Sequence, residues 1–143
     1  IMLDADTLEG VCVIDLDTVM PGSLLYDFGD AMRFGAASGP EDEKDLSKIW
    51  FDLDMFEAFT KGFASEMKDT LTEGEIANLV NSVKILTFEC GMRFLEDHLN
   101  GDTYFKIHRE NHNIDRARTQ FKLVADMEAK TAEMEAIVAK YCK

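Results

Sequence analysis

Two carboxylates one position apart, Asp15 and Asp17, are the residues of this sequence best placed to do chemistry. They follow an apolar run, residues 11–14, which has the length and composition of a buried β-strand. A carboxylate just past the end of a strand is free to hold Mg²⁺ together with phosphate oxygens. The same position also suits a carboxylate that attacks phosphorus directly. The pair therefore predicts phosphate chemistry of one of these two kinds.

The overall charge limits which phosphate-bearing ligands the chain can bind. The 143 residues carry a formal net charge of −13, and 46% of them are hydrophobic. This length predicts one domain, residues 1–143, with a core of ordinary size. Nucleic acid and anionic membranes repel such a chain, so we expect no nucleic-acid and no membrane partner. A small phosphate ligand is expected to arrive with a divalent cation.

The cysteines and the hydrophobic pattern indicate the cellular compartment. Cys12, Cys90 and Cys142 lie far apart, so they suggest neither a disulfide framework nor a CxxC metal site. No apolar run approaches the roughly 18 residues that cross a membrane, and no basic segment precedes a short apolar one. We therefore expect a cytoplasmic protein.

The sequence predicts a mainly helical chain with a short N-terminal β-hairpin. Two short apolar runs, residues 1–3 and 11–14, flank a segment of turn-forming residues and predict the hairpin. Helical spacing of apolar residues follows Pro21 and Gly22. The first and last expected helices are residues 24–34 and 114–141. A second helix is capped by Asp52 or Asp54 and carries a core stripe of Phe56, Phe59, Phe63 and Met67. A third runs from the Thr72–Glu75 capping box to Asn100.

This architecture separates the two phosphate chemistries. An aspartyl phosphatase of the haloacid dehalogenase type uses Asp-x-Asp-x-Thr, which the sequence DLDTV approaches. Such an enzyme also needs later parallel strands that deliver a lysine and further acids, and no segment after Val19 resembles a buried strand. A phosphatase is therefore the third choice, after a kinase and after a non-catalytic helical interaction module.

Two stretches carry a resemblance to a known family. VCVIDLDTVMPGSLLYDFGDAMR resembles the second signature of the aminoglycoside phosphotransferase and choline kinase superfamily. ECGMRFLEDHLNGDTYFKIHRENHNIDRARTQ is similar to the N-acetylhexosamine 1-kinases within it. The resemblance implies the C-terminal lobe of a protein-kinase-like fold, with ATP and Mg²⁺ as cofactors and an N-acetylhexosamine as substrate, phosphorylated at its anomeric hydroxyl.

The resemblance also implies roles for three acids. Asp15 would bind Mg²⁺, and Asp17 would stand nearby as a second acid of the metal site. Asp27, in the YDFGD sequence, would be structural and would accept hydrogen bonds that support the catalytic loop. The alternative for both Asp17 and Asp27 is the capping of a helix or turn.

Other parts of a kinase are absent from the sequence. The 143 residues contain no Gly-rich loop, no strand lysine with its helix glutamate and no His-x-Asp-x-x-x-x-Asn catalytic loop. We therefore expect a C-terminal lobe whose catalytic base and N-terminal nucleotide lobe lie upstream, and which is inactive alone. A lobe separated from those partners would expose an apolar strand, so we also expect it to form homo-oligomers.

The sugar-binding residues are expected on the helices. Arg93 follows Leu86 and Cys90 at helical spacing, which places it on the apolar face, where a cation needs a partner. That partner is either Glu89, one turn earlier, or the hydroxyl and amide oxygens of a sugar. Tyr104 is a second candidate sugar contact, with a half-buried core position as its alternative. Trp50 offers a stacking face with weaker support.

His108 and His112 have the four-residue spacing of zinc ligands on a helix. Arg109 stands where a zinc protease has its general-base glutamate, and no third ligand follows. Hydrogen bonding at the start of a helix is therefore the expected role of this pair.

Overall fold

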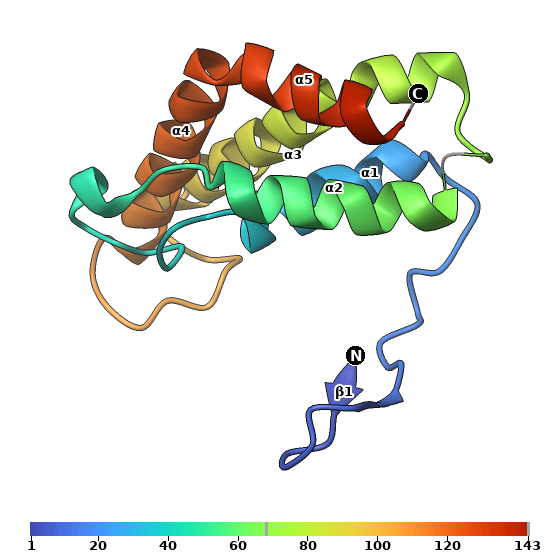
Figure 1. Cartoon of the computed structure of the whole chain (residues 1–143). Coiled ribbons are helices and arrows are strands. Elements are labelled where there is room, and N and C mark those ends of the chain that lie inside the picture. The colour runs from blue at the N-terminus through green and yellow to red at the C-terminus, as the bar shows by residue number, and fades with distance from the viewer. Residues whose placement is uncertain (68, 143) are drawn as a thin grey trace.

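Five helices form the body of the molecule, and a small hairpin projects from it (Figure 1). The computed structural model describes residues 1–67 and 69–142. None of the helices in these ranges is long and apolar enough to cross a membrane. The prediction of a mainly helical chain with an N-terminal hairpin is confirmed. The elements are β1 (Met2–Leu3), β2 (Gly10–Cys12), α1 (Leu24–Gly35), a 3-10 turn (Leu46–Lys48), α2 (Leu53–Met67), α3 (Glu73–Leu99), α4 (His112–Ala129) and α5 (Thr131–Tyr141).

The hairpin is shorter and more exposed than the sequence predicts. β1 and β2 pair antiparallel, and Asp4 Oδ1 accepts the N–H groups of Asp6 and Thr7 in the turn between them. Val13 and Ile14 lie beyond the ladder, and their side chains are 63% and 52% exposed. Within residues 1–67 and 69–142 no helix packs against the hairpin, so the apolar residues 11–14, whose composition is that of a buried strand, are exposed.

α3 contacts three of the other helices, α1, α4 and α5. It begins at the predicted capping box, in which Thr72 Oγ1 accepts the N–H of Glu75 and the Glu75 carboxylate accepts the N–H of Thr72. It packs against both α1 and α4. Two glycines permit these contacts, because a Cβ at Gly29 would lie 2.8 Å from Ser82 O and a Cβ at Gly91 would lie 2.8 Å from the Phe121 ring.

α2 closes the core with aromatic rings. Phe56 is fully buried, and the Phe28 ring of α1 contacts it and the rings of Phe59 and Phe63. Phe56 and Phe63 of the predicted stripe therefore belong to the core or pack against it, whereas Phe59 is 36% exposed. Asp52 is the residue that caps α2, because its Oδ1 accepts the N–H groups of the two residues that follow Leu53.

The last predicted helix is two helices. The sequence predicts one helix over residues 114–141, whereas α4 ends at Ala129 and α5 begins at Thr131. The Lys130 Nζ donates to Phe51 O at 2.8 Å, and Asp126 Oδ2 accepts the Phe51 N–H at 2.7 Å. These bonds hold the bend against the segment before α2, and the bend lets α5 pack on α2 (Figure 1).

The glycine contact between α1 and α3 predicts the outcome of a matched pair of substitutions. Gly29→Ala should lower the free energy of unfolding by about 1–3 kcal/mol, because the added methyl group meets the backbone of Ser82. Gly62→Ala, in α2 with open space around it, should instead raise it by roughly 0.5–1 kcal/mol through helix propensity. Urea denaturation measures both. Equal effects of the two changes would contradict this account of the α1–α3 contact.

Candidate functional site

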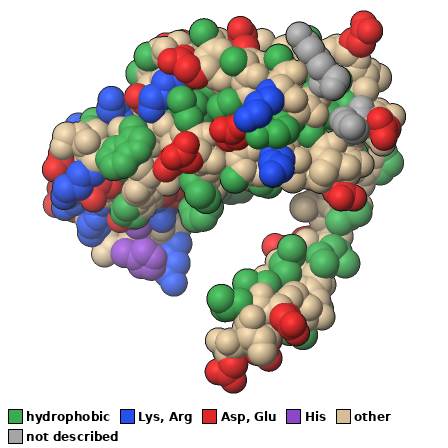
Figure 2. Space-filling model, in the orientation of Figure 1, with side chains coloured by type: hydrophobic (Ala, Val, Ile, Leu, Met, Phe, Trp, Pro, Cys, Tyr) green, Lys and Arg blue, Asp and Glu red, His purple; other side chains and the backbone are tan. Residues whose placement is uncertain are grey.

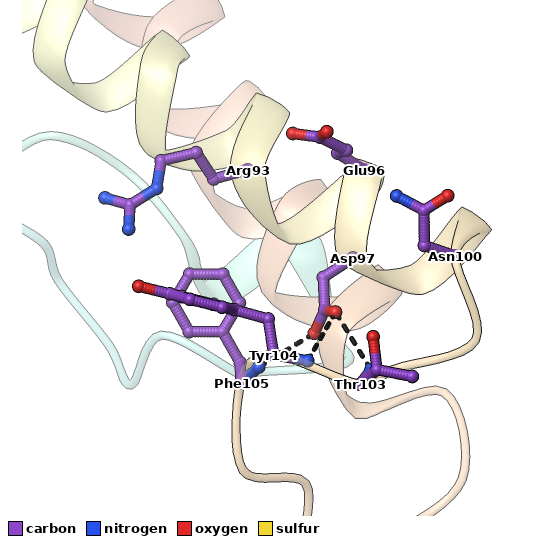
Figure 3. Close-up of a pocket in the computed structure, with 7 residues that line it drawn as sticks. All are labelled: Arg93, Glu96, Asp97, Asn100, Thr103, Tyr104 and Phe105. Atoms are coloured by element: carbon purple, nitrogen blue, oxygen red, sulfur yellow. Dashed lines mark hydrogen bonds between the residues drawn. The ribbon is translucent and has the colours of Figure 1, made fainter.

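A cavity of about 250 Å³ lies where α3 ends and the following loop turns back toward it (Figure 3). Gly101 and Asp102 both have positive φ angles, which reverse the chain direction directly after the helix. The reversal brings loop residues beside the last turns of α3. The cavity is lined by Arg93, Glu96, Asp97 and Asn100 near the end of α3 and by Thr103, Tyr104 and Phe105 of the loop.

Asp97 fixes the loop side of the cavity. Its side chain is buried, with 5% of the residue exposed. Oδ1 accepts the N–H groups of Thr103 at 2.9 Å and Tyr104 at 2.8 Å, and Oδ2 accepts the N–H of Phe105 at 2.9 Å (Figure 3). Three consecutive backbone donors thus converge on one carboxylate, which holds the two aromatic residues beside α3.

The surroundings of Asp97 favour its charged form. Burial by itself would raise the pKa of this carboxyl. The three loop N–H groups and the side-chain amide of Asn113, which donates to Oδ2 at 2.8 Å, outweigh burial and bring the pKa below its ordinary value. Asn113 Nδ2 also donates to Asp102 Oδ1, so α4 is tied to the same loop.

The structure brings the two predicted sugar contacts together. Arg93 and Tyr104 come from different elements, yet both line this cavity. Arg93 is half-exposed rather than on the apolar face, and its Nε lies 3.7 Å from Glu89 Oε1, so the expected intrahelical pair is present. Its guanidinium also stands over the Phe105 ring, 5.4 Å from the centroid.

Tyr104 is an exposed side chain rather than a half-buried core residue. Its residue exposure is 75%, and its ring meets the Phe105 ring edge-on at 4.8 Å. The cavity therefore presents a cation, two aromatic rings, a free amide at Asn100 and a carboxylate at Glu96. Such a mixture of fork donors, acceptors and ring faces is suited to a ligand rich in hydroxyl groups.

Asp15 and Asp17 lie apart from this cavity. Both are exposed in the segment between β2 and α1, and Asp15 has a left-handed φ of 63°. Neither lines the cavity, and residues 1–67 and 69–142 contain no cluster of three or more metal-binding side chains. Their carboxylates nevertheless fit Mg²⁺, which proteins often bind through one or two carboxylates plus the phosphates of a substrate.

Asp27, for which the resemblance implies hydrogen bonds to a catalytic loop, lies at the start of α1. It lies exposed in the first turn of α1, where an acid interacts favourably with the helix dipole. Ser23 is the residue that caps α1, with Oγ accepting the N–H of Leu25. Neither Asp17 nor Asp27 therefore supplies that cap.

The remaining candidates have local roles. His112 Nδ1 accepts the backbone N–H of His108 at 3.1 Å, which confirms hydrogen bonding at the start of α4 as the role of this pair. Trp50 is about half exposed, its N–H donates to Ser38 Oγ, and it does not line the cavity.

Asp97 is the site residue that sequence reasoning missed. An acid in the last turn of a helix is unfavourable beside the helix dipole, so its presence there signals another partner. That signal was available in the sequence LEDHLNGDTYF, because Asp97 precedes the helix stop at Asn100 and Gly101.

A comparison with models of known protein families finds none that matches this chain.

The convergence of donors on Asp97 predicts a large effect of removing its charge. Asp97→Asn replaces one acceptor oxygen by an amide NH2 group, which can only donate and would face N–H donors, so Tm should fall by about 5 °C or more. Glu96→Gln, a neighbouring exposed acid, should leave Tm nearly unchanged. Calorimetry of both variants at pH 7 measures this difference.

The same carboxylate predicts the direction of a pH effect. Because the folded pKa of Asp97 is lowered, its contribution to stability is complete above the ordinary value of 3.8 and is lost as pH falls through the folded pKa. The Tm difference between wild type and Asp97→Asn should therefore shrink below pH 3.8. A difference that stays constant down to pH 2.5 would contradict the assignment.

Proposed function

We propose that this chain is the C-terminal lobe of an ATP-dependent small-molecule kinase of the aminoglycoside phosphotransferase type, and that its substrate is an N-acetylhexosamine. The reaction would be in-line transfer of the ATP γ-phosphoryl group to a sugar hydroxyl, and the proposed acceptor is the anomeric hydroxyl. The proposal assigns the base and the nucleotide-binding lobe to polypeptide beyond these 143 residues, since the sequence lacks their motifs.

The observation that carries the proposal is the shared cavity of Arg93 and Tyr104. The sequence alone, without reference to any structure, makes these two residues candidate sugar contacts. They come from α3 and from the following loop and line one cavity of about 250 Å³, with Asn100 and Glu96 as further polar groups. This volume is slightly below the about 300–1,000 Å³ of sites for drug-sized ligands, which suits a single sugar ring.

Each side of the cavity offers a distinct kind of contact. The Arg93 guanidinium is half-exposed, and its Nε lies 3.7 Å from Glu89 Oε1, so its terminal nitrogens could donate to a carbonyl or hydroxyl oxygen of a ligand. Tyr104 and Phe105 offer ring surface on which the apolar face of a sugar can lie. The Asp97 bonds fix the backbone of both aromatic residues before the ligand arrives.

The metal half of the proposed site consists of Asp15, with Asp17 beside it in sequence. Mg²⁺ bound there would neutralise charge on the transferred phosphoryl group. Asp27 and Glu89 have supporting roles, through the start of α1 and through the position of Arg93.

Sugar binding to the chain tests the proposal directly. N-acetylglucosamine or N-acetylgalactosamine should perturb the NMR signals of Arg93, Asn100, Tyr104 and Phe105 at millimolar concentration. Arg93→Met should weaken binding by about tenfold, the loss expected for a charge-assisted hydrogen bond. Arg118→Met is the matched control, because Arg118 is an exposed arginine of α4 outside the cavity. Equal binding by both variants would count against the proposal.

The metal assignment is tested in the kinase that contains this chain. Asp15→Asn should lower kcat by orders of magnitude while Tm stays the same, because the amide keeps the shape and loses the charge. Asp17→Asn should lower kcat less. A normal rate for Asp15→Asn would remove Asp15 from the metal site.

One observation favours a non-catalytic interaction module as the second candidate. A shallow groove between α3 and α4 exposes apolar side chains, among them Ile85 at 62% and Phe88 at 49%. Soluble proteins use exposed apolar surfaces of this kind to contact other proteins. Absence of sugar binding, together with binding of a protein at this groove, would favour the module.

A further inference from the structure

The loop that bears Tyr104 has a second attachment, which is centred on His112. This side chain is buried at the start of α4, with 4% of the residue exposed. Its Nδ1 accepts the backbone N–H of His108 at 3.1 Å, and its Nε2 lies 3.1 Å from Asp42 Oδ2. The ring therefore joins two segments, the loop before α4 and the acidic loop that follows α1.

The partner at Nδ1 determines the protonation state of the ring. A backbone N–H can donate only to an unprotonated nitrogen, so the neutral ring carries its proton on Nε2, which faces Asp42. A second proton would have to sit on Nδ1, against the His108 N–H. Protonation is thus incompatible with the bond that holds the loop, whereas it strengthens the contact with Asp42.

The charges around His112 come from three segments. Asp42 belongs to the acidic loop, His108 and Arg109 to the loop before α4, and Arg116 to α4 itself. Arg109 donates to Asp42 O at 3.0 Å, and its other end pairs with Asp115 of α4. Figure 2 shows cationic and histidine side chains gathered at this end of the molecule, at the lower left. A charged His112 would therefore face two guanidinium groups and one carboxylate.

We propose that His112 is an acid-sensitive latch that releases residues 106–110 when its ring takes up a proton, while residues 103–105 stay bound to Asp97. The bond from His108 breaks first, and the imidazolium remains on Asp42. Arg109 then shares the Asp42 carboxylate with a second cation, and the imidazolium repels Arg116, which pairs with Glu41 and donates to Lys106 O. Both effects loosen the hold on the loop. This proposal does not depend on the ligand of the cavity.

The pH range follows from the direction of the shift. Burial and the charge of Arg116 lower the pKa of His112 below its ordinary value of 6.5, against the opposing effect of Asp42. The neutral ring therefore holds the loop fully above pH 6.5, and the hold is lost as pH falls below 6.5 through the folded pKa. The Asp97 bonds persist through this range, because the pKa of that carboxyl lies below 3.8.

NMR of the whole chain between pH 8 and pH 4.5 tests the latch. At pH 7.5 the ring nitrogens of His112 should show the neutral form protonated on Nε2. As His112 titrates, the protection of the His108 amide from hydrogen exchange, corrected for the intrinsic effect of pH, should fall by about five- to tenfold. The amides of residues 103–105 should keep their protection.

Two variants separate the latch from a general effect of acid. His112→Gln keeps an acceptor for the His108 N–H and cannot titrate, so the pH dependence at residues 106–110 should disappear. His98→Gln, which removes a histidine that contacts Asp102 instead, should retain it. Should His112→Gln fail to fold, the wild-type titration alone decides the matter. The proposal is overturned by a proton on Nδ1 at pH 7.5, by unchanged protection at His108 as His112 titrates, or by simultaneous loss of protection in the α3 core.

Discussion

The close packing of α3 against α1 and α4 is the constraint on which the rest of the structure depends. Neither contact leaves room for a side chain, because a Cβ at Gly29 or at Gly91 would lie 2.8 Å from an atom of the neighbouring helix. This packing fixes the direction of α3, and so the place where its last turn and the following loop meet. The cavity is built at that point, from residues of the helix end and of the loop. Backbone packing in the core therefore sets the geometry of the site before any polar contact forms.

Near the C-terminal end of α3, several of the acids that give the chain its net charge of −13 make polar contacts between segments. Asp97 is buried against three backbone N–H groups and one amide, and Asp115 and Asp42 meet the guanidinium of Arg109. A buried carboxylate is costly unless such donors satisfy it, and truncating either partner leaves the other unpaired. These acids connect, through hydrogen bonds and ion pairs, segments that have few apolar contacts of their own.

The helices could be predicted from signals that are local in the sequence. The features that the sequence did not predict depend on contacts between residues far apart in the chain. The Thr72–Glu75 box and the phenylalanine stripe act over one or two turns, so the start of α3 and the core face of α2 could be read directly. The bend at Lys130 could not, because Asp126 and Lys130 look like an ordinary intrahelical pair. Their other partner, Phe51, is 75 or more positions away. Two residues that line the cavity, Arg93 and Tyr104, were candidates from the sequence, but Asp97 was not, since its hydrogen bonds form only once the loop has turned back.

The two halves of the proposed site differ in what holds them. The sugar half is built by α3 and its loop, and its aromatic residues are fixed by Asp97. The metal half lies on the segment after β2, where residues 1–23 are exposed throughout. A two-stranded hairpin is at best marginally stable alone, and this one carries exposed apolar side chains such as Val11 and Val13. Catalysis demands that reacting groups be held within a fraction of an ångström. As the metal ligand of the proposed kinase, Asp15 would meet that demand only with another protein surface covering the hairpin, so the proposed metal half would depend on a partner surface in a way that the proposed sugar half would not.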